Sequence, residues 1–347
     1  MVNRLITLLF TGMVWLMASL PAKAAAEWDS YKSRFLMADG RIIDTGNNNV
    51  SHTEGQGFAM MMAVSNDDRA SFDKIWNWTN ATLRNPKNGL FYWRYNPVEA
   101  DPIADKNNAT DGDTFIAWAL LKAGQKWHDS GYLKESDAIA KALVTHNVIQ
   151  FADKRVMLPG VNGFNLNSSV TLNPSYFIFP AWRDFYSYSH RAEWQKMIDD
   201  GLTLLDAMRF GEHRLPVDWV TVNKDGTVEP ATDWPARFGF DAVRIPLYLN
   251  WYQKDLPQNR IFSSFWEKQP EWNAPAWINV FTGTVAEYPL AGGMQAVRDF
   301  SVGSIREDYW DKRYVGEDYY SSSLKLLTKA AAMEVNLTAH SGSTVVF

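Results

Sequence analysis

Residues 109–127 read Ala-Thr-Asp-Gly-Asp-Thr-Phe-Ile-Ala-Trp-Ala-Leu-Leu-Lys-Ala-Gly-Gln-Lys-Trp, and they contain the clearest structural signal in the chain. From Ile116 to Trp127, apolar residues recur at the three- and four-residue spacing of a helix with one buried face. The spacing predicts a helix over 113–127, directly after a pair of acids that flank a glycine.

These acids, Asp111 and Asp113, allow two interpretations. One is helix capping, in which Thr110 and Asp113 approximate a capping box and both acids benefit from the positive end of the helix dipole. The other is a functional pair at the mouth of a buried helix, because capping alone does not explain Asp111.

A second segment, residues 51–60, reads Ser-His-Thr-Glu-Gly-Gln-Gly-Phe-Ala-Met and begins another predicted helix, 55–65. Glu54 precedes an apolar run, and burial of a carboxyl favours its neutral, proton-donating form. The helix N-terminus acts in the opposite direction, because its dipole favours a negative charge. The alternative is structural, with Thr53 as the helix cap and Glu54 in the first turn.

The third segment, residues 237–248, reads Arg-Phe-Gly-Phe-Asp-Ala-Val-Arg-Ile-Pro-Leu-Tyr. On a helix, Arg237, Asp241, Arg244 and Tyr248 would share one face. Two arginines beside Asp241 would keep this carboxylate ionised, which suits a base. A structural ion pair is the alternative, since such pairs are common on helices.

Taken together, the three segments resemble the signatures of the family 8 glycoside hydrolases: E-G-Q-G, A-T-D-G-D-x-x-I-A and D-A-x-R-I-P, in the family's order. The resemblance implies an all-α fold, an (α/α)6 barrel of six helical hairpins with long functional loops. It also implies an endo-β-1,4-glucanase that hydrolyses cellulose-type chains with inversion, which requires one carboxyl as acid and one as base. Glu54 would be the acid, Asp241 the base and Asp111 a residue that positions the substrate.

The resemblance extends to residues that would bind the sugar chain. The expected substrate-binding residues are Trp93, Asp113, Tyr176, Arg244, Tyr319 and Tyr320. Most of the 16 tryptophans belong to the core, since large aromatic side chains bury much area, whereas a few in the cleft would stack on sugar rings. For Asp113, support of the helix start is the alternative role.

The resemblance to this family does not by itself decide the substrate or the partners. Chitosanase, xylanase and lichenase are alternatives within the fold, and a non-catalytic glucan-binding part of a secretion machine is an alternative outside catalysis. The chain is most similar to members that act in the periplasm during bacterial cellulose synthesis. The expected partners are therefore β-1,4-glucan chains and the envelope cellulose synthase complex.

No cofactor or metal is expected. The chain has no cysteine, and its six histidines are scattered without metal-ligand spacing. Without disulfides, the fold must be stabilised by its core, which a chain of this length can build. Serine and histidine also lack the pattern of a nucleophile elbow, which disfavours a hydrolase with a catalytic triad.

The N-terminus predicts export. Residues 1–24 combine Arg4, an apolar run and the small-residue pattern Ala-Lys-Ala before a cleavage point, as signal peptides do. An uncleaved membrane anchor is the alternative. Cleavage would leave a single catalytic domain, 25–347, without a membrane span, in the periplasm or secreted. Its 32 basic and 39 acidic side chains give a net charge of −7, which disfavours nucleic acid as a partner.

Helical patterns dominate the rest of the chain. The predicted helices are 28–37, 55–65, 68–82, 113–127, 136–150, 175–188, 192–208, 239–252, 261–267, 294–303 and 319–334. Long segments rich in Pro, Asn, Asp and Gly separate some of them, notably 85–108 and 216–237. In a helical protein, such loops usually carry the function.

Overall fold

The computed structural model describes residues 26–305 and 317–341, and helices form most of it. The predicted signal peptide, 1–24, lies outside the described residues. A first helix covers 26–35. The α-helices that follow are α2 (Thr53–Ser65), α3 (Arg69–Leu83), α4 (Thr110–Trp127), α5 (Ser130–Asn147), α6 (Phe179–Ser189), α7 (Ala192–Ala207), α8 (Arg244–Tyr252), α9 (Asn259–Trp266), α10 (Gly292–Ser301) and α11 (Tyr319–Ser341).

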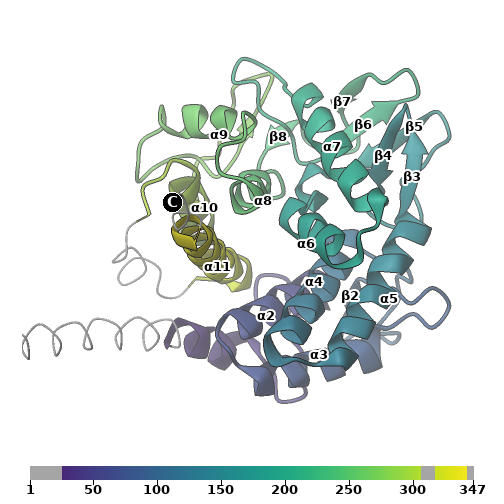
Figure 1. Ribbon diagram of the computed structural model, residues 1–347. Helices are drawn as coiled ribbons and strands as arrows, with labels where there is room; N and C mark the ends of the chain where they lie inside the picture. The colour runs from purple at the N-terminus through teal and green to yellow at the C-terminus, as the bar shows by residue number, and fades with distance from the viewer. Residues whose placement is uncertain (1–25, 306–316, 342–347) are drawn as a thin grey trace, which may run out of the picture.

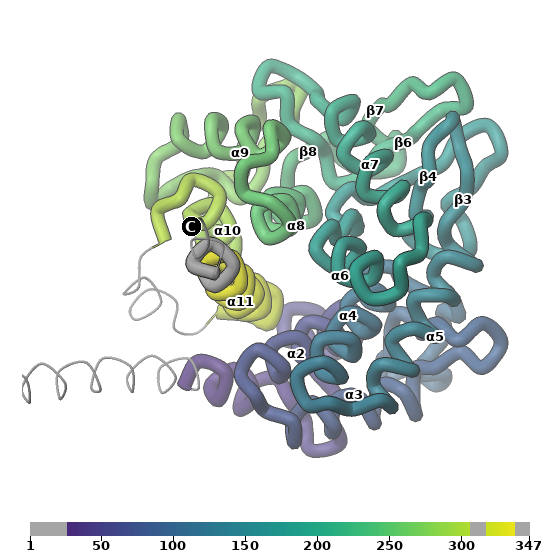
Figure 2. The backbone as a smooth tube through the Cα atoms, in the orientation of Figure 1, coloured from purple at the N-terminus to yellow at the C-terminus, as the bar shows by residue number. Residues whose placement is uncertain are grey.

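Six of these helices form the inner ring. α2 packs against α4, α4 against α6, α6 against α8, α8 against α10, α10 against α11, and α11 against α2. The helices α3, α5, α7 and α9 pack against α2, α4, α6 and α8, respectively, from outside. Figure 1 shows the two layers around a common centre, and the tube in Figure 2 follows the chain from one pair to the next.

The two layers differ in burial, which explains their sequence patterns. The inner helix α2 buries eleven of its thirteen residues, whereas the outer helix α3 buries five of fifteen. A helix that is surrounded by other helices is apolar on all sides, whereas an outer helix needs only one apolar stripe. The inner ring therefore forms the core of the barrel.

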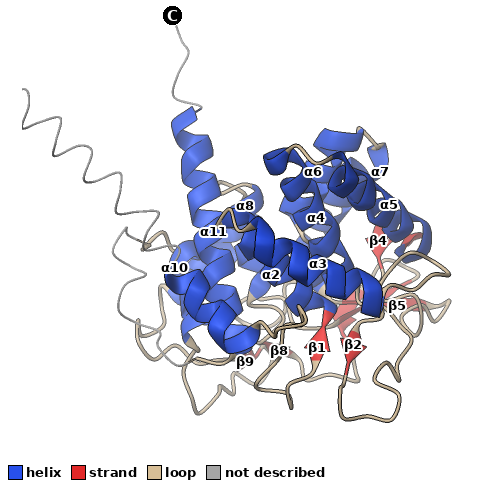
Figure 3. Ribbon diagram, turned by 90° about the horizontal axis from the view of Figure 1, so that it is seen from below, coloured by secondary structure: helices blue, strands red, loops and turns tan. Residues whose placement is uncertain are grey.

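Short strands and long loops gather at one end of the barrel (Figure 3). The strands are β1 (Ser51–His52), β2 (Arg94–Tyr95), β3 (Val148–Phe151), β4 (Lys154–Met157), β5 (Ser169–Leu172), β6 (Val220–Asn223), β7 (Val228–Pro230), β8 (Arg237–Phe238) and β9 (Ile278–Asn279). They pair antiparallel as β1–β2, β3–β4, β5–β6–β7 and β8–β9. In the largest sheet, Leu172 lies opposite Val220.

At this end the N-termini of the inner helices converge. Glu54 in the first turn of α2 and Asp111 in the first turn of α4 both lie against Arg244, the first residue of α8. Tyr320, at the start of α11, donates a hydrogen bond to the carbonyl oxygen of Phe240, just before α8. The fold thus directs the positive ends of several helix dipoles toward one place.

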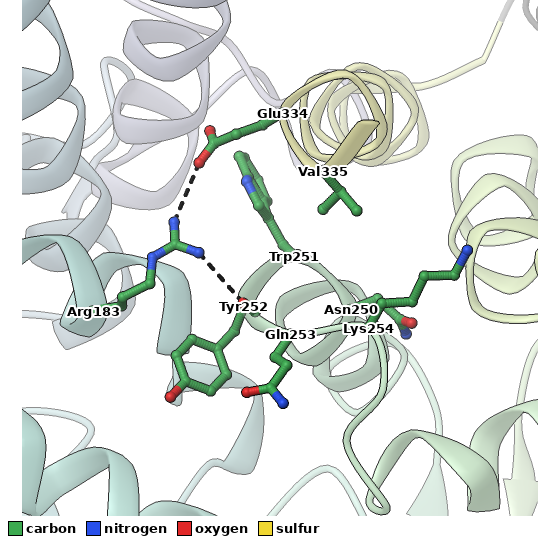
Figure 4. A pocket seen from close by; sticks show the side chains of 8 residues that line it. All are labelled: Arg183, Asn250, Trp251, Tyr252, Gln253, Lys254, Glu334 and Val335. Atoms are coloured by element: carbon green, nitrogen blue, oxygen red, sulfur yellow. Dashed lines mark hydrogen bonds and ion pairs between the residues drawn. The ribbon is translucent and has the colours of Figure 1, made fainter. Parts of the chain in front are cut away.

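The opposite end of the inner helices is closed by charged side chains. Lys122 of α4 contacts Asp184 of α6 and Glu334 of α11 at 2.9 and 3.2 Å. Arg183 joins the same two carboxylates, and we call Lys122, Arg183, Asp184 and Glu334 the closing cluster. A pocket of about 110 Å³ lies beside it, where Arg183 and Glu334 face each other (Figure 4).

Each predicted helix has a counterpart, but several differ in extent. α5 begins at Ser130 rather than at 136, and α11 continues to Ser341 rather than ending at 334. The C-terminal end of 136–150 is the strand β3, because the chain turns there into a hairpin with β4. The range 175–188 is divided into the 3-10 turn η1 (Pro174–Tyr176) and α6. α8 begins at Arg244 rather than at 239. Within the described residues, no helix combines the length and apolar character needed to cross a membrane.

Candidate active site

The centre of the site is the guanidinium group of Arg244, which is 2% exposed. One of its nitrogens, Nη1, contacts Glu54 and lies 3.8 Å from Asp111 Oδ2. Its other terminal nitrogen, Nη2, donates to Asp241 Oδ1 at 2.7 Å and to Ser175 Oγ at 2.9 Å. A single cation therefore joins three carboxyl groups from three different parts of the chain.

Asp241 is placed by a turn that Asp218 organises. The Oδ1 atom of Asp218 accepts hydrogen bonds from the backbone N–H groups of Gly239, Asp241 and Ala242 at 2.8 to 3.1 Å. Arg237 donates to the other oxygen of Asp218 at 3.0 Å. The buried Asp218 thus fixes the backbone that carries Asp241 toward Arg244.

Glu54 is placed by an unusual helix cap. The cap of α2 is His52, whose Nδ1 accepts the backbone N–H of Gly55 at 3.2 Å. The other ring nitrogen, Nε2, faces Asp44 Oδ2 at 3.3 Å, which fits a neutral ring with its proton on Nε2. The buried Thr53, which the structural alternative treats as the cap, has no hydrogen bond from its hydroxyl group within the described residues.

Asp111 reaches the same centre because α2 and α4 approach closely. A side chain at Gly112 would place its Cβ 2.1 Å from Thr53 Oγ1 and 2.7 Å from the backbone nitrogen of Glu54. Only glycine allows this approach, because the nearest backbone atoms cannot move without displacing α2. The glycine between the two acids therefore brings Asp111 and Glu54 together.

The electrostatics of the site follow from burial and from the crowding of carboxyl groups. Burial raises the pKa of Asp111 to about 8, and the charge of Glu54 adds to the effect. Asp111 is therefore protonated at neutral pH and can donate a hydrogen bond. Burial also raises the pKa of Asp241, to about 6, while Arg244 opposes the rise. Asp241 is consequently ionised at neutral pH.

Two predictions from the sequence are wrong in their details. Arg237 does not accompany Asp241 on a helix: it lies in β8, where it pairs with Asp218. The capping box is also absent, because α4 begins after Ala109 without a side-chain cap. Thr110 instead donates its hydroxyl proton to the carbonyl of Leu158 at 3.1 Å.

Asp113 supports the loop before α4 and does not face the site. Its side chain has no exposed surface, and its two oxygens accept hydrogen bonds from the backbone of Phe91 at 2.9 Å and from Asn108 Nδ2 at 2.8 Å. With both oxygens bound in the interior, Asp113 is unavailable to a sugar. The structural role considered for it replaces substrate binding.

The predicted aromatic residues lie around the carboxyl groups. Trp93 is half-buried, and its backbone carbonyl accepts the N–H of Thr53, next to Glu54. The indole N–H of Trp93 donates to Asp105 at 2.8 Å. Tyr176 and Tyr320 are also half-buried, with ring centres 5.9 and 6.0 Å from the guanidinium carbon of Arg244.

Of the two adjacent tyrosines, Tyr320 is partly exposed and Tyr319 is buried. Tyr319 is 1% exposed and packs edge-on against Phe35 and His52. Its ring supports the start of α2 from within the core. Tyr320, in contrast, lies between Arg244 and the turn that carries Asp241.

Sequence reasoning missed three residues that complete the site. Asp218 and Trp219 come from the long segment 216–237, and Asn173 precedes η1. The oxygen of Asn173 accepts hydrogen bonds from Ser175, and its side chain lowers the pKa of Asp241. None of the three has a helical spacing or a local motif, so their role becomes visible only when the chain is folded.

Metal ligands are not part of this arrangement. Over 26–305 and 317–341, no group of three or more histidine, aspartate or glutamate side chains is arranged to hold a metal ion. The three carboxyl groups of the site share an arginine.

Comparison with known proteins identifies the family and its fold. The model of glycosyl hydrolases family 8 matches residues 2–334. The chain belongs to this family. It is 53% identical to an endoglucanase from Cellulomonas uda, over 87% of this chain and 84% of the relative. The predicted glycoside hydrolase class and (α/α)6 barrel are confirmed by this membership.

Solved structures agree with the assignment. Endoglucanase Cel10 of Klebsiella pneumoniae superposes with a TM-score of 0.87 at 53% identity, covering 89% of this chain and 99% of that one. The endo-β-1,4-glucanase CMCax of Acetobacter xylinum gives a TM-score of 0.86 at 34% identity, with 91% and 99% covered. This family 8 protein therefore shares its whole barrel with proteins described as glucanases.

Proposed function

We propose that this family 8 hydrolase is an endo-β-1,4-glucanase that cuts cellulose-type chains. The observation that supports the proposal most directly is the group of three carboxyls around Arg244, at the end of the barrel where the loops gather. Burial of several carboxyl groups costs desolvation free energy, and sugar binding alone does not require it. Hydrolysis of a glycosidic bond, in contrast, needs one carboxyl as acid and one as base.

Glu54 is proposed as the acid. It lies at the N-terminus of α2, fixed by the His52 cap, and contacts Nη1 of Arg244. That contact stabilises a negative charge, whereas proton donation requires a neutral carboxyl. The donor must therefore take up its proton as the sugar chain displaces it from Arg244.

Asp241 is proposed as the base that activates water. Its Oδ1 is bound to Nη2 of Arg244, while Glu54 is bound to Nη1 of the same group. Family members are inverting enzymes. In such enzymes the two carboxyls stand roughly 6.5–9.5 Å apart, which leaves space for a water molecule at the base. Because Glu54 and Asp241 bind different nitrogens of the guanidinium, the two carboxyls do not share a donor atom.

Asp111 is proposed to hold the sugar next to the scissile bond. Its raised pKa keeps a proton on the carboxyl at neutral pH, so it can donate a hydrogen bond to a sugar hydroxyl. A hydrogen bond that tightens as the ring distorts lowers the barrier. Asp111 forms no covalent bond with the sugar, because inversion proceeds in one displacement.

The remaining assignments concern the protein's place in the cell. The signal-like residues 1–24 support export to the periplasm or beyond, and residues 25–347 are proposed as one catalytic domain. The likeness to family members that act beside cellulose synthesis supports a role in trimming nascent chains near the envelope synthase. Its aromatic residues Trp93, Tyr176 and Tyr320 would stack on the glucan.

The activity is tested by measuring reducing ends released from carboxymethyl cellulose, chitosan, xylan and mixed-linkage glucan. We expect the highest specific activity on carboxymethyl cellulose, whose glucose units are joined by β-1,4 bonds alone. A preference for chitosan, xylan or mixed-linkage glucan would retain the mechanism and change the substrate. Binding without cleavage of all four would contradict the proposal.

A further inference from the structure

Three aromatic rings lie in a row beside Asp241, and we call them the ring stack. The ring of Trp219 is nearly parallel to that of Trp234, at 4.6 Å between centres and 13°, and to that of Phe164, at 5.9 Å and 12°. Tyr176 meets the edge of Trp219 at 6.1 Å. Trp219 is the member that contacts all the others.

The sheet β5–β6–β7 holds this stack in place. The backbone carbonyl of Phe164 accepts a hydrogen bond from Thr171 in β5. Trp219 directly precedes β6, and its carbonyl accepts the N–H of Ala231, directly after β7. Each ring of the stack is thus carried by a segment next to a strand.

The stack ends in a hydrogen bond to Asp241. The indole N–H of Trp219 donates to Asp241 Oδ2 at 3.2 Å, while Arg244 donates to Oδ1 at 2.7 Å. Two donors on different oxygens fix the plane of a carboxylate. Because the indole cannot turn without losing its ring contacts, the direction of its N–H is also fixed.

We propose that Trp219 is a positioning residue for the base Asp241, held by the ring stack, and that it aims the carboxylate and stabilises its ionised form. The inference rests on the proposed role of Asp241. It assigns Trp219 a function other than a sugar platform, since two neighbouring rings already lie parallel to it.

Other charged and titratable groups also act on Asp241. These are Arg244, Asp218, Glu54, Asp111, Tyr176, Tyr248 and Tyr320. Burial raises the pKa of each of the three tyrosines, so they stay neutral across the working range. A substitution at Trp219 leaves all these groups in place, so its effect on the pH profile reports the indole hydrogen bond.

The experiment compares pH profiles of kcat/KM on a soluble cello-oligosaccharide. Trp219→Phe retains an aromatic ring in the stack and removes the N–H donor. The low-pH side of this profile, its acidic limb, reports the ionisation of Asp241. We expect this limb to move to higher pH by about 0.5–1 pH unit, because a donor to the ionised carboxylate is lost. We also expect kcat to fall by about tenfold, with KM nearly unchanged.

A matched control is available at the far end of α4. There the indole N–H of Trp127 donates to Asp67 at 2.8 Å, the same kind of bond outside the site. Trp127→Phe should leave the acidic limb unchanged. In a second pair of variants, Trp234→Leu should move the limb in the same direction as Trp219→Phe, and Trp234→Phe should restore it.

The outcomes are distinct. A higher KM with an unmoved limb in Trp219→Phe would make the ring a sugar platform and overturn the inference. An unmoved limb in both Trp219→Phe and Trp234→Leu would also overturn it, and Trp234→Leu keeps the test valid if the first variant does not fold. If the unsubstituted protein cleaves no glucan, the proposed function fails instead.

Discussion

Replacement of Arg244 by glutamine tests the electrostatic logic of the site. The substitution removes the only cation in contact with Glu54, Asp111 and Asp241 among the described residues. Charges about 4 Å apart interact by about 4 kcal/mol at an effective dielectric constant near 20. Since one third of the Asp241 side chain is exposed, screening by water reduces this to about 2 kcal/mol.

That energy converts directly into a pH shift. About 1.4 kcal/mol corresponds to one pKa unit, so loss of Arg244 should raise the pKa of Asp241 from about 6 by about 1.5 units. The acidic limb of kcat/KM should move upward by the same amount. At pH 6.5 the ionised fraction of the base should fall from about three quarters to about one tenth, a roughly eightfold loss from ionisation alone.

The assay is the pH dependence of cello-oligosaccharide cleavage, with circular dichroism to confirm the fold. Arg244→Lys provides the matched variant, because it retains the charge and loses the planar fork that reaches Glu54, Ser175 and Asp241 together. We expect it to lower kcat with a smaller limb shift. An acidic limb that stays in place in Arg244→Gln would refute the assignment of Arg244 as the cation that keeps the base ionised.

Four further outcomes are expected. Glu54→Gln retains shape and loses the donated proton, so turnover of an unactivated glucan should fall by about 10²–10⁴-fold, and near-normal turnover by a folded variant would exclude Glu54 as the acid. Proton NMR of the first product from a β-linked cello-oligosaccharide should show the α-anomer at the new reducing end, whereas an initial β-anomer would require a retaining mechanism. Trp93→Ala should raise KM for long oligosaccharides by about tenfold through loss of stacking; unchanged binding would remove Trp93 from the subsites. Asp184→Asn should lower the free energy of unfolding at pH 7 by about 2–3 kcal/mol. Burial raises the pKa of Asp184, but the charges of Lys122 and Arg183 outweigh it, so the folded pKa lies below its ordinary value of 3.8. The stabilisation is therefore present above pH 3.8 and is lost as the pH falls through the folded pKa. In chemical denaturation, the free energies of unfolding of the two proteins should converge only below about pH 4. A constant difference down to pH 2 would contradict this prediction.

The helices could be predicted from the sequence because their signals are local. The run from Ile116 to Trp127 has helical spacing, and α2 and α8 each contain a continuous apolar run, 57–64 and 245–249. The N-terminal boundaries were less well predicted, since they depend on contacts from elsewhere. α8 starts at Arg244 because Asp218, far away in sequence, binds the N–H groups of the preceding turn.

The site was predictable to the extent that it lies in contiguous motifs. Glu54, Asp111 and Asp241 stand in such motifs, and the structure brings them to one guanidinium; their catalytic roles stay predictions. Arg237 was assigned wrongly because a helical face was assumed where the chain forms a strand. Trp219 and Asp218 could not be found, because a hydrogen bond between distant segments leaves no periodic trace in either.

The closing cluster has a consequence for how this protein can change. The helices α2, α4, α8 and α11 begin at the candidate site, while α4, α6 and α11 contribute side chains to the closing cluster at the opposite end. Lys122 lies on the same helix as Asp111, eleven residues further along it. Substitutions that change stability to heat or acid can therefore arise in the closing cluster, and substitutions that change the polysaccharide bound can arise in the loops, with little effect of one on the other. Mutagenesis for a more stable glucanase should begin at the closing cluster.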